Sequence, residues 1–214
     1  MVLAGLQASR TMGSMELQLQ LRDGPAWRQA IERGDLGVWD LRPLQETVHH
    51  SPRWKERLGF PCVHEADSTD FWRCRVHPDD IEAMLEAMRA HAAGDTPTYE
   101  ARFRLRSNGS GYRLLHSRGR VVERDDTGRV LRMVGTMIDL TDRPCSPRGG
   151  LVDEVPRDDS ALLPGPPFHL LLTAPEPTSD AAVAEANERL VASVLDLLEE
   201  GCRELQDIGG NSKV

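Results

Sequence analysis

Apolar and polar residues alternate most strictly in the segment 99–106, YEARFRLR. Every second residue from Tyr99 to Leu105 would lie on one face of a strand, with charged residues on the other, as in an antiparallel strand with one buried face. The Asn-Gly pair within 107–111 favours a tight hairpin turn. Two further strands are therefore predicted at 112–123 and 130–140, and the three strands would form a meander.

Helical spacing is clearest in residues 78–93, where Ile81, Met84, Leu85 and Met88 form one apolar stripe. The preceding HPDD at 77–80 places proline at the first helical position and two acids at the positive end of the helix dipole. This pattern predicts a structural helix cap. The alternative, a catalytic or metal-binding cluster, is disfavoured because a lone histidine with two acids is common at helix starts.

The remaining elements define a fold class. Short helices are predicted at 25–33 and 51–59, a turn of helix near 68–72, and strands at 36–41 and 46–50. Because a three-stranded meander cannot bury its apolar face alone, we expect an α+β fold. It would contain a five-stranded antiparallel sheet with helices on one face, followed by a separate C-terminal amphipathic helix.

The C-terminal helix is predicted at 181–208 and would end at Gly209-Gly210. Its apolar stripe requires a partner, which could be the preceding domain, a second copy of the chain or another protein. The spacing suits a short coiled coil, but Gly201 interrupts the stripe. The segment 141–180 is rich in Pro, Gly and Asp and resembles a linker, within which 168–173 could dock.

Composition excludes several classes of protein. The net charge of −8 argues against non-specific nucleic-acid binding, and no apolar run approaches the roughly 20 residues of a membrane helix. The N-terminus lacks the pattern of a signal peptide. The cysteines Cys62, Cys74, Cys145 and Cys202 form no C-x-x-C pair, so reduced thiols in a cytoplasmic protein are expected rather than disulfides or a metal site.

Several motifs occur in the order typical of one known family. They are GVWDL (37–41), SPRWKERLGF (51–60), VHPDD (76–80), YEARFRLRSNGSGYRLLHSRGRVVERDDTGRV (99–130) and RMVGTMIDLTDR (132–143). Together they resemble a PAS domain followed by a PAC motif, as found in bacterial signal-transduction proteins. The resemblance covers roughly residues 23–143, and Leu114 departs from it because the family usually carries Trp there.

The resemblance implies a sensory module that is not an enzyme. Such a domain binds a small molecule, a cofactor or nothing between its sheet and helices, and passes a conformational change to flanking helices. The expected organisation is a flexible leader at 1–20, the PAS domain at 21–143, a linker at 144–178, the amphipathic helix at 179–208 and a tail at 209–214. A homodimer and an effector protein acting in trans are the expected partners, without nucleic acid or membrane insertion.

The resemblance also suggests site residues. Apolar inward positions would either line a ligand pocket or fill the core, and a filled or unliganded core is favoured. These positions are Trp39, Phe60, Phe71, Met84, Met88, Phe103, Leu114, Met133 and Met137. The expected dimer or signalling contacts on the flanking helices are Trp27, Ile31, Leu190, Val194 and Leu197.

No cofactor is specified by the sequence. The Gly-x-Asn-Cys-Arg-Phe-Leu-Gln motif of flavin-cysteinyl light-oxygen-voltage receptors is absent, and Cys74 lacks its context. His91 follows the inward stripe and could ligate heme iron, although a half-exposed residue at the helix end is the simpler interpretation. The alternatives to a PAS interaction module are thus a heme-binding gas or redox sensor using His91, and the input fragment of a histidine kinase or diguanylate cyclase.

One charged pattern has two interpretations. Arginines recur on the polar faces of the first two meander strands, where they could bind an anion or form a solvated face with partners such as Glu100 and Glu123. The solvated face is favoured because charge rows on exposed strands are common. The arginines are Arg102, Arg104, Arg106, Arg113, Arg118 and Arg120.

Overall fold

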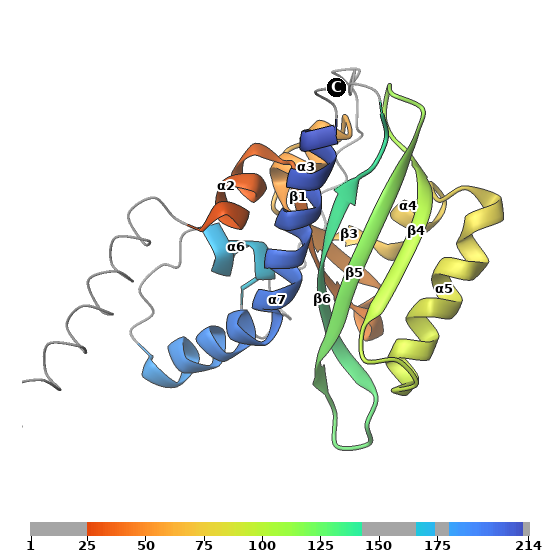
Figure 1. The fold of residues 1–214 in the computed structure, drawn as a ribbon. Coiled ribbons are helices and arrows are strands. Elements are labelled where there is room, and N and C mark those ends of the chain that lie inside the picture. The colour runs from red at the N-terminus through yellow and green to blue at the C-terminus, as the bar shows by residue number, and fades with distance from the viewer. Residues whose placement is uncertain (1–24, 143–165, 174–179, 212–214) are drawn as a thin grey trace, which may run out of the picture.

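The computed structural model describes residues 25–142, 166–173 and 180–211. Its centre is a six-stranded antiparallel sheet in the order β3-β2-β1-β6-β5-β4 (Figure 1). The strands are β1 (Leu36–Arg42), β2 (Thr47–His50), β3 (Asp67–Ser68), β4 (Tyr99–Arg106), β5 (Tyr112–Arg124) and β6 (Val130–Asp139). The predicted α+β fold is confirmed. The sixth strand was missed because β3 has only two residues, too few to produce an alternating pattern.

The predicted helices are present as α2 (Ala26–Arg33), α3 (Pro52–Arg57), α4 (Thr69–Arg73), α5 (Pro78–Ala93) and α7 (Ala181–Asn211). The structure adds a helix, α6 (Phe168–Thr173), within the expected linker, and a 3-10 turn, η1, at Pro43–Gln45. Helix α7 continues through the two glycines that were expected to end it, because glycine weakens an existing helix by only about 1 kcal/mol. Predictions for the 1–20 leader, Cys145, most of the linker and residues 212–214 lie outside the described residues.

The sheet is covered on both faces. We call the face that carries Trp39, Phe103 and Met137 the inner face, which packs against α4, α5 and residues from α3. The opposite, outer face carries Val38 and Ile138 and packs against α2, α6 and α7 (Figure 1). The expectation of helices on one face only is therefore wrong, whereas the predicted C-terminal helix is present. Helix α7 is the partner of the outer face.

The HPDD segment is a helix cap, as predicted. The Nδ1 atom of His77 accepts a hydrogen bond from the Asp79 N–H (3.3 Å). Asp80 accepts from both the backbone N–H and the guanidinium of Arg104 (2.8 Å each), which ties the start of α5 to β4. The Arg104 hydrogen bond lowers the pKa of Asp80 to about 2.

The described residues contain neither a candidate membrane span nor a candidate metal cluster. None of their helices combines the length and apolar character needed to cross a membrane. Within the same residues, no group of three or more His, Cys, Asp or Glu side chains is arranged to hold a metal ion.

Candidate functional site

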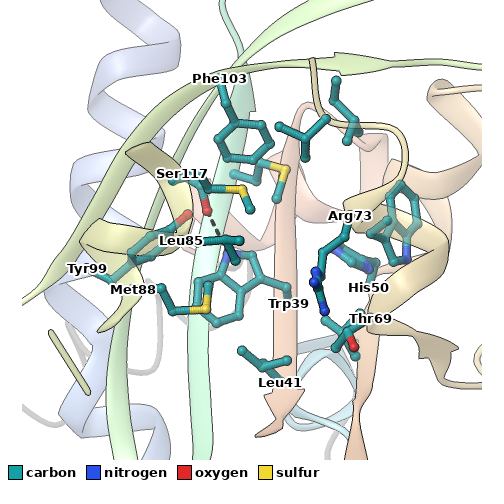
Figure 2. A pocket seen from close by; sticks show the side chains of 16 residues that line it. Trp39, Leu41, His50, Thr69, Arg73, Leu85, Met88, Tyr99, Phe103 and Ser117 are labelled. Atoms are coloured by element: carbon teal, nitrogen blue, oxygen red, sulfur yellow. Dashed lines mark hydrogen bonds between the residues drawn. The ribbon is translucent and has the colours of Figure 1, made fainter. Parts of the chain in front are cut away.

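A cavity of about 130 Å³ lies between the inner face and helices α4 and α5 (Figure 2). Its walls are mainly apolar, and its polar side chains come from β2, α4 and β5. The apolar and aromatic lining is Trp39, Leu41, Val48, Trp72, Val76, Met84, Leu85, Met88, Tyr99, Phe103, Leu105 and Met137. The polar lining is His50, Thr69, Arg73 and Ser117. Of the two versions favoured by the sequence, a filled core is not observed, and an unliganded cavity stays a prediction.

Five of the predicted pocket residues line this cavity: Trp39, Met84, Met88, Phe103 and Met137. Met133 is instead fully buried in the inner core. Phe60 and Phe71 are not part of the lining. They pack edge to face with each other and with Trp72, which does line the cavity.

The prediction for Leu114 is wrong. Leu115 pairs with Phe103 across the β4–β5 ladder and is fully buried on the inner face. Because successive strand residues point to opposite faces, Leu114 points away and is 40% exposed.

One end of the cavity is a satisfied hydrogen-bond network. The indole Nε1–H of Trp39 donates to Ser117 Oγ (3.1 Å) and to the carbonyl of Thr136 (3.2 Å). Tyr99 also hydrogen-bonds Ser117, and burial raises the pKa of its phenol. Glycines at 119 and 135 make room for the Trp39 ring, because a Cβ at either position would overlap it. This end therefore holds Trp39 in place and offers few free polar groups.

The other end contains an unsatisfied polar group. His50 is 5% exposed, and its Nδ1 has no hydrogen-bond partner among the described residues. The ring packs against Trp72 with centroids 4.4 Å apart. Burial, with the positive charge of Lys55, lowers the pKa of His50 to about 3, so the imidazole is neutral at pH 7. Figure 2 shows His50, Thr69 and Arg73 together, across the cavity from Tyr99 and Ser117.

The polar residues of this end were missed by sequence reasoning. Val48 and His50 are two residues apart on β2 and share the inner face, so strict alternation could have identified His50. Thr69 and Arg73 lie four residues apart on α4, which places them on one side of the helix. Their proximity to His50 depends on how α4 packs against β2, for which no local pattern exists.

His91 lies outside the cavity lining and is buried, not half exposed as expected. Its Nδ1 is 2.8 Å from the carbonyl of Thr96, to which it donates, and its Nε2 accepts from the Val121 N–H (3.0 Å). Both ring nitrogens are therefore engaged in joining the end of α5 to β5. The cavity is also smaller than the roughly 300–1,000 Å³ usual for cofactor sites. This geometry does not support a heme ligand.

The outer face binds α7 through apolar and charged contacts. Trp27, Ile31, Val194 and Leu197 are buried in this outer core, with Leu190 packed beside them. All the residues predicted for dimer or signalling contacts thus pack against one another within the outer core of the same chain.

The arginine pattern divides between several environments. Arg118 lies 3.5 Å from Glu204 and 3.7 Å from Glu200 of α7, and Arg120 pairs with Asp196 of the same helix. The expected partner Glu100 is present, 3.6 Å from Arg118. At these two arginines the face is only partly solvated, with side chains 24% and 33% exposed, because α7 packs beside them.

A buried histidine completes the contact with α7. His116 on β5 has Nε2 2.8 Å from Glu100 and Nδ1 2.9 Å from Glu204. Together with Arg118 and Arg120, it links the outer face to the acidic residues of α7 at positions 196, 200 and 204.

Comparison with known proteins finds a similarity over part of the chain. Residues 47–137 match the family described as PAS fold. Similar solved structures include a sensory box histidine kinase/response regulator from Burkholderia thailandensis E264, with 28% identity, 55% of this chain and 86% of the other covered, and a TM-score of 0.47. Another is the N-terminal domain of a diguanylate cyclase with PAS/PAC sensor from Marinobacter aquaeolei. It has 25% identity, 49% of this chain and 94% of the other are covered, and the TM-score is 0.42. No curated relative matches the chain.

Proposed function

Because residues 47–137 belong to the PAS fold family, we propose that this chain is a non-catalytic sensory module whose inner cavity binds a small ligand and whose helix α7 transmits the change. The single observation that carries the proposal is that the same strands line the cavity and bind α7. Ser117 of β5 faces the cavity, whereas its neighbours His116 and Arg118 contact α7.

Strand β6 repeats this arrangement. Met137 lines the cavity, while the adjacent Ile138 belongs to the outer core beneath α7. Since alternate strand residues point to opposite faces, a ligand that displaces Met137 or Ser117 would move residues that support α7. A ligand can shift the position of α7 only as far as its binding free energy differs between the two positions of the helix.

Helix α2 is part of the same transmission path. Its Trp27 and Ile31 share the outer core with Leu197 of α7, and the guanidinium of Arg28 donates to the carbonyl of Leu172 in α6 (2.9 Å). A shift of α7 would therefore reach the helix that precedes the sheet. A homodimer built from these residues would require α7 to leave the outer face, and it stays a prediction, as do an effector acting in trans and an origin within a longer kinase or cyclase.

The proposal can be tested through Cys202, a residue of α7 whose side chain is buried in the outer core between the helix and the sheet. A variant that replaces Cys62, Cys74 and Cys145 by Ser leaves this single thiol, and its reaction rate with a thiol reagent reports how closely α7 is packed. Benzene is a suitable neutral probe, because a cavity of roughly 150 Å³ can hold it. We expect saturating benzene to change the Cys202 rate several-fold.

A matched control retains only Cys62, which is exposed; its rate should stay constant. Binding is followed independently by the fluorescence of Trp39 and Trp72, which both line the cavity. If fluorescence shows occupancy while the Cys202 rate does not change, transmission through α7 is excluded.

A further inference from the structure

We infer that the cavity recognises a small carboxylic acid with one apolar ring or a short chain, with its carboxylate bound by Arg73 and His50. This inference rests on the proposed ligand-binding function and specifies its ligand class. It combines the size of the cavity, the charge at one end and an unsatisfied buried nitrogen.

The size of the cavity limits the apolar part of the ligand. Its volume of about 130 Å³ is close to the roughly 150 Å³ that accommodates benzene in an engineered protein cavity. Met84 and Met88 of α5 form one wall, and methionine side chains adapt readily to the shape of a ligand. A single ring or a short aliphatic chain would therefore fit, whereas a fused ring system would require expansion.

Charge at the polar end favours an anion. Among the described residues that line the cavity, Arg73 alone carries a permanent charge. It pairs with Asp70 at 3.2 Å, and the side chains of Arg73 and Asp70 are 51% and 80% exposed. Such exposed pairs within a helix are weak, so a ligand carboxylate can replace Asp70, and its planar oxygens suit the guanidinium fork.

His50 supplies the independent observation. A buried nitrogen without a hydrogen-bond partner is unfavourable. His50 is one of the residues that line the cavity, and its Nδ1 has no partner among the described residues. A neutral imidazole can donate one N–H, so a ligand oxygen at this end would satisfy it. An apolar ligand would leave it unsatisfied. A phosphate would carry more charge than the one arginine balances.

The experiment compares benzoate with benzamide, its neutral isostere, on the full chain at pH 7, with Trp fluorescence and calorimetry as readouts. We expect benzoate to bind about tenfold more tightly, as one charge-assisted contact permits. Arg73→Gln should remove this preference and leave benzamide affinity unchanged. Arg89→Gln is the matched control, since Arg89 is an exposed arginine of α5 paired with Glu86 and lies outside the lining.

A second variant increases binding instead of reducing it. Asp70→Asn frees Arg73 from its competing carboxylate, so benzoate affinity should rise about threefold while benzamide affinity stays the same. His50→Phe should weaken binding of both probes, because both present a carbonyl oxygen to the imidazole.

The outcomes separate this inference from the proposed function. Equal affinity for benzoate and benzamide, or a benzoate preference that survives Arg73→Gln, overturns the acid ligand while leaving a benzene-dependent Cys202 response intact. Tight binding of inorganic phosphate would also overturn the inference, because phosphate has no apolar group to fill the cavity and would show that the site binds anions in general. Failure of benzene, benzamide and benzoate alike to bind would overturn both proposals.

Discussion

On the inner face of the sheet, Trp39, Phe103 and Met137 surround a cavity of about 130 Å³. On the outer face, Leu36, Val38 and Ile138 are packed so closely beneath helices that none is more than 2% exposed. The same strands thus support one open and one filled core. A mutation that removes equal volume from each should therefore have unequal effects.

Glycine explains part of the difference in how closely the covering helices approach. A Cβ at Gly201 of α7 would lie 2.9 Å from Leu36 Cδ1, so glycine lets α7 lie directly on β1. On the inner face, α5 presents the longer side chains Met84 and Met88 toward the sheet. Gly201, which interrupts the coiled-coil pattern, is therefore explained by the packing of α7 on the sheet of its own chain.

The largest predicted effect compares Leu36→Ala with Leu105→Ala, two strand residues on opposite faces. Leu36 is fully buried in the filled outer core, whereas Leu105 lines the cavity. We expect Leu36→Ala to lower the free energy of unfolding by about 3–5 kcal/mol and Leu105→Ala by about 2–3 kcal/mol. A side chain packed on all sides gives up more van der Waals attraction on truncation than one that already borders a cavity. Urea denaturation measures both values, and equal values, or a larger effect at Leu105, would contradict the contrast between the two faces.

An intermediate effect is predicted for Gly201→Leu. The larger side chain would overlap Leu36 and should cost about 1–3 kcal/mol, although leucine has the higher helix propensity. In the single-thiol variant, reaction of Cys202 should accelerate because α7 packs less closely. Gly201→Ala is the control: the flexible end of Leu36 can move, so its effect should be within about 1 kcal/mol. Unchanged stability in Gly201→Leu would mean that α7 is not held against β1.

The smallest predicted effect concerns Asp80, which secures α5 over the inner face. Its pKa is lowered to about 2 by the Arg104 hydrogen bond, so its stabilisation is present above about pH 4 and is lost as pH falls toward 2. Asp80→Asn should cost about 1 kcal/mol at pH 6, and the difference from the unmodified protein should disappear as pH falls through about 2. Asp79→Asn is the control, since Asp79 is more exposed and lies 3.4 Å from Arg104. Parallel stability profiles for Asp80→Asn and the unmodified protein would contradict this assignment.

The candidate site was partly predictable. Trp39, Phe103 and Met137 follow from alternation along their strands, and Met84 and Met88 from helical spacing. Leu114 was assigned to the wrong face because adjacent Leu114 and Leu115 are both apolar, and only the pairing of Leu115 with Phe103 decides between them. His50 and Arg73 were missed because polar residues give no apolar periodicity.

The sequence alone determined most of the elements and the resemblance to the PAS fold, because these depend on residues close together in the chain. Tyr99 to Leu105 alternate and form β4, and Pro78 with His77 begins α5, since strand pattern and helix capping act within a few residues. Only the tertiary structure decided that α7 covers the outer face, that His91 uses both ring nitrogens within the fold, and that a cavity remains beside His50. These features depend on how closely surfaces distant in sequence fit together, and differences of a few ångströms decide between a filled core and a binding site.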